Sequence, residues 1–94
     1  MRHELKCWPE QFEALHDGRK PFEVRRDDRG FKVADVLWLR EWALVRGARG
    51  RVRYAFGRPM GFYTGRNLER TVTYILEGGQ FGLPAELVVM GLRP

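Results

Sequence analysis

Hydrophobic and polar residues alternate along most of this chain with the two-residue period of β-strands. This pattern, or a short apolar run, predicts strands over residues 3–7, 22–26, 36–42, 68–77 and 87–92. Residues 36–42 are apolar on both faces, which predicts a central strand. Residues 51–56 also alternate, and they fit either a sixth strand or an exposed loop that orders on binding.

Alternation also assigns side chains to faces. Phe22 and Val24 should lie on one side of their strand, with Glu23 and Arg25 on the other. In the segment 68–77, the apolar face is expected to carry Leu68, Val72, Tyr74 and Leu76.

One segment has a helical pattern instead. Residues 8–18 place Pro9 at the first helical position and Gly18 just past the end, and Phe12 and Leu15 share a face. The elements together predict a mostly β (α+β) fold: a small β-barrel of five to six strands with one or two short helices. We expect a single domain over residues 1–94, with a glycine-rich basic insertion over about residues 43–65 whose order the sequence leaves open.

Composition excludes several classes of protein. The single cysteine, Cys7, cannot form an internal disulfide, and no apolar run is long enough to span a membrane. We therefore expect a cytoplasmic protein with no membrane partner. The chain has no serine, which excludes a serine triad. His3, His16 and Cys7 lack the spacing of zinc ligands, so neither a metal nor a cofactor is expected.

Charge is unevenly distributed along the chain, whose net charge is +5. Residues 1–42 are balanced, whereas residues 43–70 carry seven arginines against one glutamate. Such a basic stretch is expected of a protein that binds a polyanion, although an arginine-rich solvated surface would look the same.

Ionisable side chains that could act at a site are concentrated in the octet G-x-K-x-x-E-x-R. Gly18, Lys20, Glu23 and Arg25 form it between the helix and the second strand. Lys20 could act as a nucleophile or base if burial and nearby arginines disfavoured its charged form, or it could contact phosphate or pair with a nearby acid. Glu23 could exchange protons or accept the amino group of a base, or simply pair with Arg25 or Lys20. Lys20 and Glu23 share a cleft only if Pro21 interrupts the strand.

Several further residues are candidates for contact with a nucleic acid. Arginines can hold phosphate in a forked geometry, and aromatic rings can stack on bases. Trp42 and Tyr63 flank the basic stretch, whereas Trp38 is expected in the core and Arg29 in a structural pair. The predicted nucleic-acid contacts are Arg19, Lys20, Glu23, Arg25, Arg26, Trp42, Arg49, Arg51, Arg53, Tyr63 and Arg66.

The octet and several flanking motifs resemble those of the ASCH domain family, small barrels of the PUA-like superfamily, and in particular a bacterial and phage subgroup. The matching motifs are H-x-L-K at residues 3–6, D-R-x-F-x-V-x-D-x-L within residues 28–37, Y-T-G-R at residues 63–66, and the closing run at residues 87–92. Two departures stand out. Ala34 occupies a position that is usually glycine, and the basic stretch at residues 44–60 is longer than usual.

The resemblance implies a cleft beside the octet that binds RNA or a nucleotide. Some members resemble amidohydrolases that remove the acyl group of N4-acetylcytidine, which makes Lys20 and Glu23 catalytic candidates. In those members a threonine stands at the position of Glu23, and a later glutamate takes part; here Glu69 and Glu77 are the candidates for that glutamate. Three functions remain open: a domain that binds RNA or a nucleotide, an amidohydrolase, and a protein-interaction module whose arginines meet an acidic partner.

Overall fold

The computed structural model describes all 94 residues and is built mainly of strands. The elements in chain order are β1 (Arg2–Cys7), α1 (Pro9–His16), β2 (Phe22–Arg26), β3 (Val36–Leu44), the 3₁₀ turn η1 (Ala48–Gly50), β4 (Tyr54–Ala55), β5 (Arg58–Pro59), β6 (Gly61–Glu77) and β7 (Leu87–Arg93). The mostly β fold predicted from the alternation is confirmed. Neither helical element is long and apolar enough to cross a membrane.

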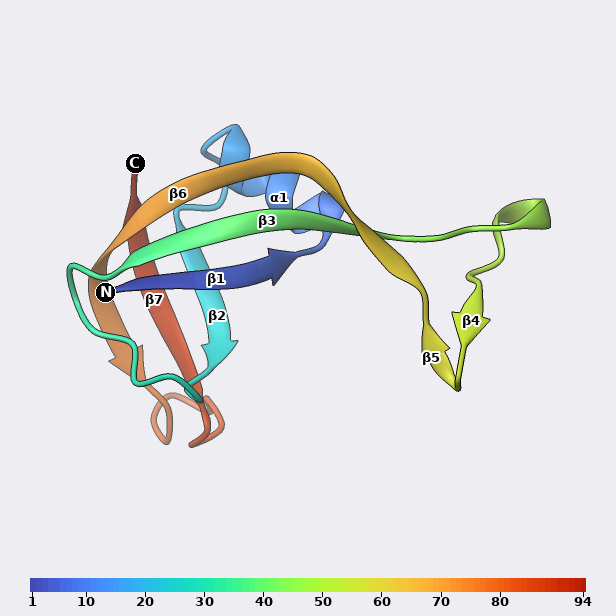
Figure 1. Ribbon diagram of the computed structural model, residues 1–94. Helices are drawn as coiled ribbons and strands as arrows, with labels where there is room; N and C mark the ends of the chain where they lie inside the picture. Colours follow the sequence, from blue (N-terminus) through green and yellow to red (C-terminus); the bar gives the residue numbers. More distant parts are fainter.

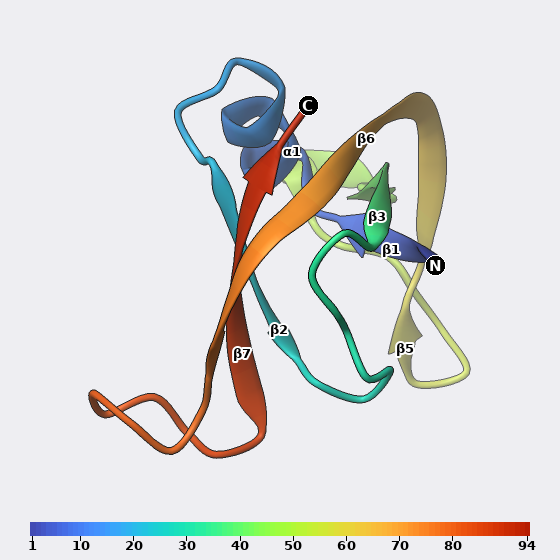
Figure 2. The ribbon, with the colours of Figure 1, turned by 90° about the vertical axis from the view of Figure 1, so that its left-hand side faces the viewer.

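Five strands form one curled sheet in the order β1-β3-β6-β7-β2 (Figures 1 and 2). β1 pairs with β3 in parallel and the other neighbours are antiparallel. The central position predicted for residues 36–42 is confirmed, since β3 lies between β1 and β6. The sheet is a half-barrel, because its two edge strands, β1 and β2, form no ladder with each other.

Two arginines bridge these unpaired edges. The Arg25 guanidinium donates to the backbone carbonyl of Lys6 on β1. Arg29, just beyond β2, donates to the carbonyl of Glu4 at 2.7 Å. Both acceptors belong to the free edge of β1, so side-chain donors supply the partners that a closed barrel would supply from its backbone.

The core lies on the inner face of the curl. Leu37 and Leu39 of β3 are fully buried there, together with Met90 of β7. Helix α1 places Phe12 and Leu15, each 1% exposed, against this core, as their i,i+3 spacing predicts. Fully burying such a side chain contributes roughly 1.5–3 kcal/mol, so the helix is held to the sheet mainly by these two residues.

Two predicted facings are wrong. A β-bulge between Val72 and Tyr74 adds one residue to β6 and reverses the alternation, so Tyr74 is exposed and Ile75 packs on the core instead. Trp38 is not in the core either. Its ring lies on the outer face of the sheet, between the guanidinium groups of Arg2 at 4.4 Å and Arg40 at 4.9 Å.

Residues 45–60 leave the half-barrel as a projecting arm (Figure 1). Of the predicted strand at residues 51–56, only Tyr54 and Ala55 are strand, paired with Arg58 and Pro59. Backbone hydrogen bonds from Val45 to Met60 and from Arg53 to Val45, both 2.9 Å, hold the arm together. No arm residue is buried, so the alternation at residues 51–56 does not reflect a core-facing strand.

Candidate functional site

A pocket of about 550 Å³ opens between the end of β1, the first turn of α1 and strand β2. It takes residues from all three elements, which are far apart in the sequence but adjacent at the two sheet edges. The residues that line it are Lys6, Cys7, Trp8, Gln11, Lys20, Phe22, Glu23, Val24 and Arg25. The lysine, glutamate and arginine of the octet thus lie in one pocket.

Glu23 is the charge at the centre of this pocket and is only 3% exposed. Its Oε1 accepts a hydrogen bond from Lys20 Nζ at 3.1 Å, and its Oε2 accepts one from Arg25 Nε at 2.7 Å. A buried carboxylate requires such compensation, since leaving it unpaired would cost several kcal/mol. Lys20 also donates to Gln11 Oε1 at 2.7 Å, so two of its three protons are used.

Local backbone chemistry brings Lys20 to this position. Gly18 has a φ of +85°, which lets the chain reverse after α1, and the Lys20 N–H then donates to the Ala14 carbonyl. β2 begins only at Phe22, after Pro21. Pro21 therefore does separate Lys20 from the strand, the condition under which the two charged side chains can meet.

The facing of β2 is also as predicted, with Glu23 and Arg25 on the opposite side from Phe22 and Val24. The polar side, however, points inward. Glu23 is buried, whereas Phe22 and Val24 are about 40% exposed. An edge strand that buries its charges and exposes its apolar residues is unusual, and the pocket accounts for it.

Cys7 lies on the same inner face and is 4% exposed. Its burial, and after it the neighbouring carboxylate of Glu23, raise the pKa of the thiol to about 11. The thiol is therefore protonated at neutral pH and is a poor nucleophile. In this environment Cys7 acts as a small buried apolar residue of the core.

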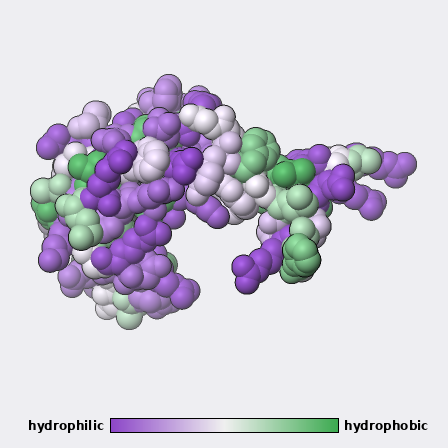
Figure 3. Space-filling model, viewed as in Figure 1, coloured by the Kyte–Doolittle hydropathy of each residue, from purple (hydrophilic) through white to green (hydrophobic).

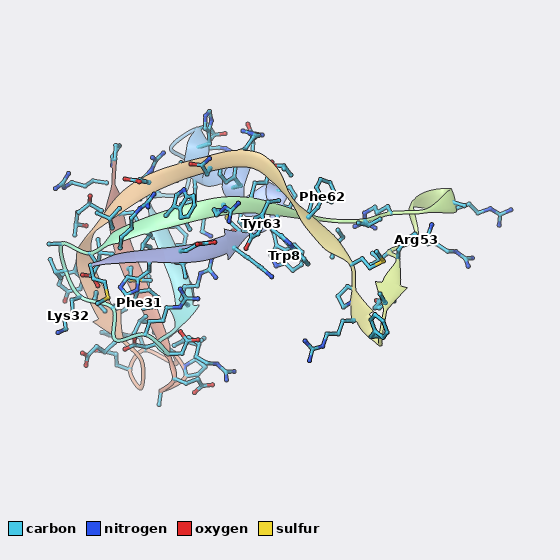
Figure 4. All side chains as sticks on the ribbon, in the orientation of Figure 1. Trp8, Phe31, Lys32, Arg53, Phe62 and Tyr63 are labelled. Carbon is cyan, nitrogen blue, oxygen red and sulfur yellow. The ribbon has the colours of Figure 1, made fainter.

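Trp8 lines the pocket on the side where the arm joins the half-barrel (Figure 4). Trp8 is 52% exposed, and its ring packs 5.4 Å from that of Trp42. Lys6 Nζ lies 4.6 Å above the Trp42 ring. These three residues, with Cys7 and Arg25, line a smaller hollow of about 170 Å³ beside the main pocket. The Arg40 guanidinium lies 3.7 Å from the ring centre of the predicted stacking residue Tyr63, which is 38% exposed.

The other predicted contacts lie outside the pocket lining. Arg19 pairs with Asp17. The pKa of Asp17 is lowered mainly by the hydrogen bond from the Arg19 backbone N–H and next by the one from the Arg19 side chain. Arg26 is exposed on β2. Arg66 pairs with Glu13 at 3.1 Å and approaches Glu41. Three more, Arg49, Arg51 and Arg53, are exposed on the arm.

Glu41 is a buried acid that the sequence reasoning missed. It is 6% exposed, accepts a hydrogen bond from Thr64 Oγ1 at 2.7 Å, and is opposite Cys7 in the β1–β3 register. The two acids considered instead are exposed, and Glu69 pairs with Arg2 on the outer face. No three His, Cys, Asp or Glu side chains lie close enough together to hold a metal ion.

Three pocket residues, Lys6, Trp8 and Gln11, were also missed. Trp8 and Gln11 stand in the predicted helix segment and Lys6 in a predicted strand, where nothing in the local pattern distinguishes them. The H-x-L-K motif at residues 3–6 was the one feature of the sequence that could have marked Lys6 as a site residue.

Comparison with known proteins places the chain in a family. An uncharacterized 12.9 kDa protein in the GpA 3′ region of Escherichia phage P2 is 28% identical over 75 residues, which cover 80% of this chain and 54% of that protein. The chain thus matches about half the length of this phage relative. The resemblance to the ASCH family stays a prediction. A family model described as a domain of unknown function, DUF3850, matches residues 2–92, and the chain belongs to this family.

Proposed function

We propose that the pocket binds a nucleotide, as a free molecule or as one unpaired residue of an RNA strand. The observation that carries the proposal is the buried Glu23 carboxylate, held between Lys20 and Arg25 and lying beside an exposed indole. A carboxylate with free lone pairs accepts the exocyclic amino group of cytosine or adenine. The third proton of Lys20 can be donated to the ring nitrogen next to that amino group. Uracil presents a carbonyl where the amino group would be, and the carboxylate would repel it.

The exposed indole supplies the second part of the recognition. Trp8 is fixed by its contact with Trp42 yet keeps half of its surface exposed. Stacking of a base on such a ring contributes roughly 1–3 kcal/mol. An RNA base can reach both the ring and Glu23 only when it is unpaired, so single strands are the expected RNA form.

The test is a titration of the protein with cytidine, adenosine and uridine monophosphates, followed by amide NMR shifts and tryptophan fluorescence. We expect saturable shifts at pocket residues with the cytidine or adenosine nucleotide and weaker ones with uridine. Glu23→Gln keeps the side-chain shape but removes the charge, and Lys20→Met removes the cation. Both variants should weaken binding at least tenfold, as expected for hydrogen bonds to charged groups.

Lys32→Met is the matched control for Lys20→Met, because it removes one lysine charge at the end of the half-barrel away from Trp8 (Figure 4). It should leave nucleotide affinity unchanged. Equal losses in the two lysine variants would show that only general charge matters. No saturable shift with any nucleotide would refute the proposal, provided that the variants keep a folded spectrum.

The contact between Lys20 Nζ and Glu23 Oε1 favours one second candidate, the removal of an acyl group from N4-acetylcytidine. Glu23 would take a proton from water, whose oxygen attacks the acyl carbon, while the Lys20 ammonium stabilises the oxyanion. The bond from that carbon to N4 then breaks, and Glu23 returns the proton to N4. The products are cytidine and acetate.

This candidate is tested by following cytidine release from N4-acetylcytidine, with Lys20→Met and Lys32→Met in parallel. Release by the native protein and by Lys32→Met, but not by Lys20→Met, would establish the activity. No release by the native protein would rule out this substrate and leave the pocket as a binding site.

A further inference from the structure

The arm, residues 45–60, is the largest part of the molecule outside the five-stranded sheet, and none of its residues lines the pocket. It projects from the half-barrel, and in the space-filling view a hollow separates the two (Figure 3). It contributes no buried residue, so it adds nothing to the core. A self-paired extension of this kind is therefore a candidate contact surface rather than a part of the hydrophobic scaffold.

The arm carries the whole net charge of the chain. It has five arginines and no acid, which equals the net charge of +5, so the remaining residues are balanced. None of the five forms an ion pair, whereas Arg19, Arg25 and Arg66 all pair with acids. A concentration of unpaired guanidinium groups favours a polyanion and opposes contact with the arm of a second copy. The five are Arg46, Arg49, Arg51, Arg53 and Arg58.

The β4–β5 turn of the arm exposes an aromatic residue in an unfavourable conformation. Phe56 and Gly57 form the two-residue turn between β4 and β5, with φ of +53° and +75°. Turns of this kind favour Asn or Gly at both positions, because a side chain crowds the backbone there. Phe56 nevertheless occupies the first position, with 104% relative exposure, and Tyr54 beside it is 65% exposed. Strain and full exposure of an apolar ring, in a segment that also carries five unpaired arginines, point to a contact role.

We infer that the arm is a second nucleic-acid contact, separate from the pocket. The Phe56 ring stacks on an unpaired base of a single strand, and the arm arginines contact the neighbouring phosphates. Single-strand binding combines these two ingredients, a basic surface that follows the backbone and exposed rings that accept any base. The proposal goes beyond the pocket, because it predicts affinity for a strand that depends little on base sequence.

The test is fluorescence anisotropy of a labelled single-stranded RNA titrated with the full chain. Phe56→Ala should weaken binding about fivefold or more, as expected for one lost stacked base. The chain offers a matched control in Phe81, which is 88% exposed with a φ of +51°. Phe81 lies in the loop between β6 and β7, where the nearest charged residues in sequence are Glu77 and Glu86. Phe81→Ala should leave RNA affinity unchanged.

A second variant tests the phosphate contacts. Changing Arg49, Arg51 and Arg53 together to glutamine should flatten the dependence of log affinity on log salt by about two, since each phosphate contact on a single strand contributes roughly 0.7. The same variant should bind a mononucleotide with the native affinity. That result would show that the half-barrel of the variant is folded.

Three outcomes would overturn the inference: no RNA binding by the native chain, equal RNA affinity in the native chain and Phe56→Ala, or Phe56-dependent binding to anionic lipid vesicles but not to RNA. The two proposals fail separately. Mononucleotide binding without Phe56-dependent RNA binding would refute the arm alone. Phe56-dependent RNA binding without mononucleotide binding would refute the pocket alone.

Discussion

Ala34 shows how one residue can strain an otherwise regular fold. It has a φ of +77°, in the left-handed region, at the turn where its N–H donates to the Val72 carbonyl at 2.8 Å. The sequence motif suggested a glycine position, and the backbone keeps that conformation although the residue is alanine. Its Cβ therefore crowds the backbone, which costs roughly 1–2 kcal/mol.

We predict that Ala34→Gly stabilises the protein. Relief of the crowding should exceed the entropic cost of glycine, which gives a net gain of about 0.5–1 kcal/mol in the free energy of unfolding. Urea denaturation would measure it. Ala14→Gly in helix α1 is the opposite control, because glycine in a helix should lose about 1 kcal/mol. A loss of stability in both variants would contradict strain at Ala34.

Asp35 should control stability in acid. Its carboxylate is nearly buried and accepts hydrogen bonds from His3 Nε2 at 2.8 Å, the Met1 ammonium at 3.0 Å and the Lys32 N–H at 3.0 Å. The hydrogen bond from His3 is the main cause that lowers the pKa of Asp35 from 3.8 to about 2. This contribution to stability is complete above the unfolded pKa of 3.8 and is lost as the pH falls toward 2. In Asp35→Asn, the free energy of unfolding should therefore fall less steeply between about pH 4 and pH 2 than in the native protein. The same pH dependence in both proteins would contradict this role of Asp35.

At the scale of elements, the join between the arm and the sheet depends on Gly61, the first residue of β6. A Cβ at Gly61 would lie only 2.0 Å from the Trp42 ring, so any larger residue must displace that indole. Trp42 in turn supports Trp8 at the pocket. Gly61 thus connects the arm, through the packed Trp42 and Trp8 rings, to the pocket.

We predict that Gly61→Ala displaces Trp42, shifts the tryptophan emission to longer wavelength and weakens nucleotide binding. Emission spectra and the nucleotide titration would measure both effects. The emission shift should disappear when Trp42→Phe is added. Gly57→Ala in the β4–β5 turn is the control, because an added Cβ there meets no atom within 4 Å. An unchanged emission spectrum for Gly61→Ala would mean that the ring does not pack on this backbone.

At the scale of the whole molecule, the half-barrel and the arm should be separable. Leu44 and Gly61 are paired in the β3–β6 register, so a two-residue Asn-Gly turn can replace residues 45–60. Because no arm residue is buried, the free energy of unfolding should change by less than about 1 kcal/mol in urea denaturation. RNA affinity should fall while nucleotide binding persists. Loss of cooperative unfolding would mean that the arm belongs to the core structure.

The sequence by itself determined the elements, because each depends on neighbours along the chain. The two-residue period located β1, β2 and β3, a short apolar run located β7, and Pro9 and Gly18 bounded the helix. The octet also places Lys20, Glu23 and Arg25 within six residues of each other, and all three line one pocket.

Only the tertiary structure decided the rest. Alternation assigns residues to two faces but does not say which face is inside, so the inward turn of Glu23 was not determined. A bulge reverses alternation without a clear signal in the sequence, which is why Tyr74 was misplaced. Trp8, Gln11 and Glu41 reached the site or its surroundings because the strand order and the curl of the sheet join distant segments. Such contacts depend on the packing of the whole chain, and no local pattern encodes them.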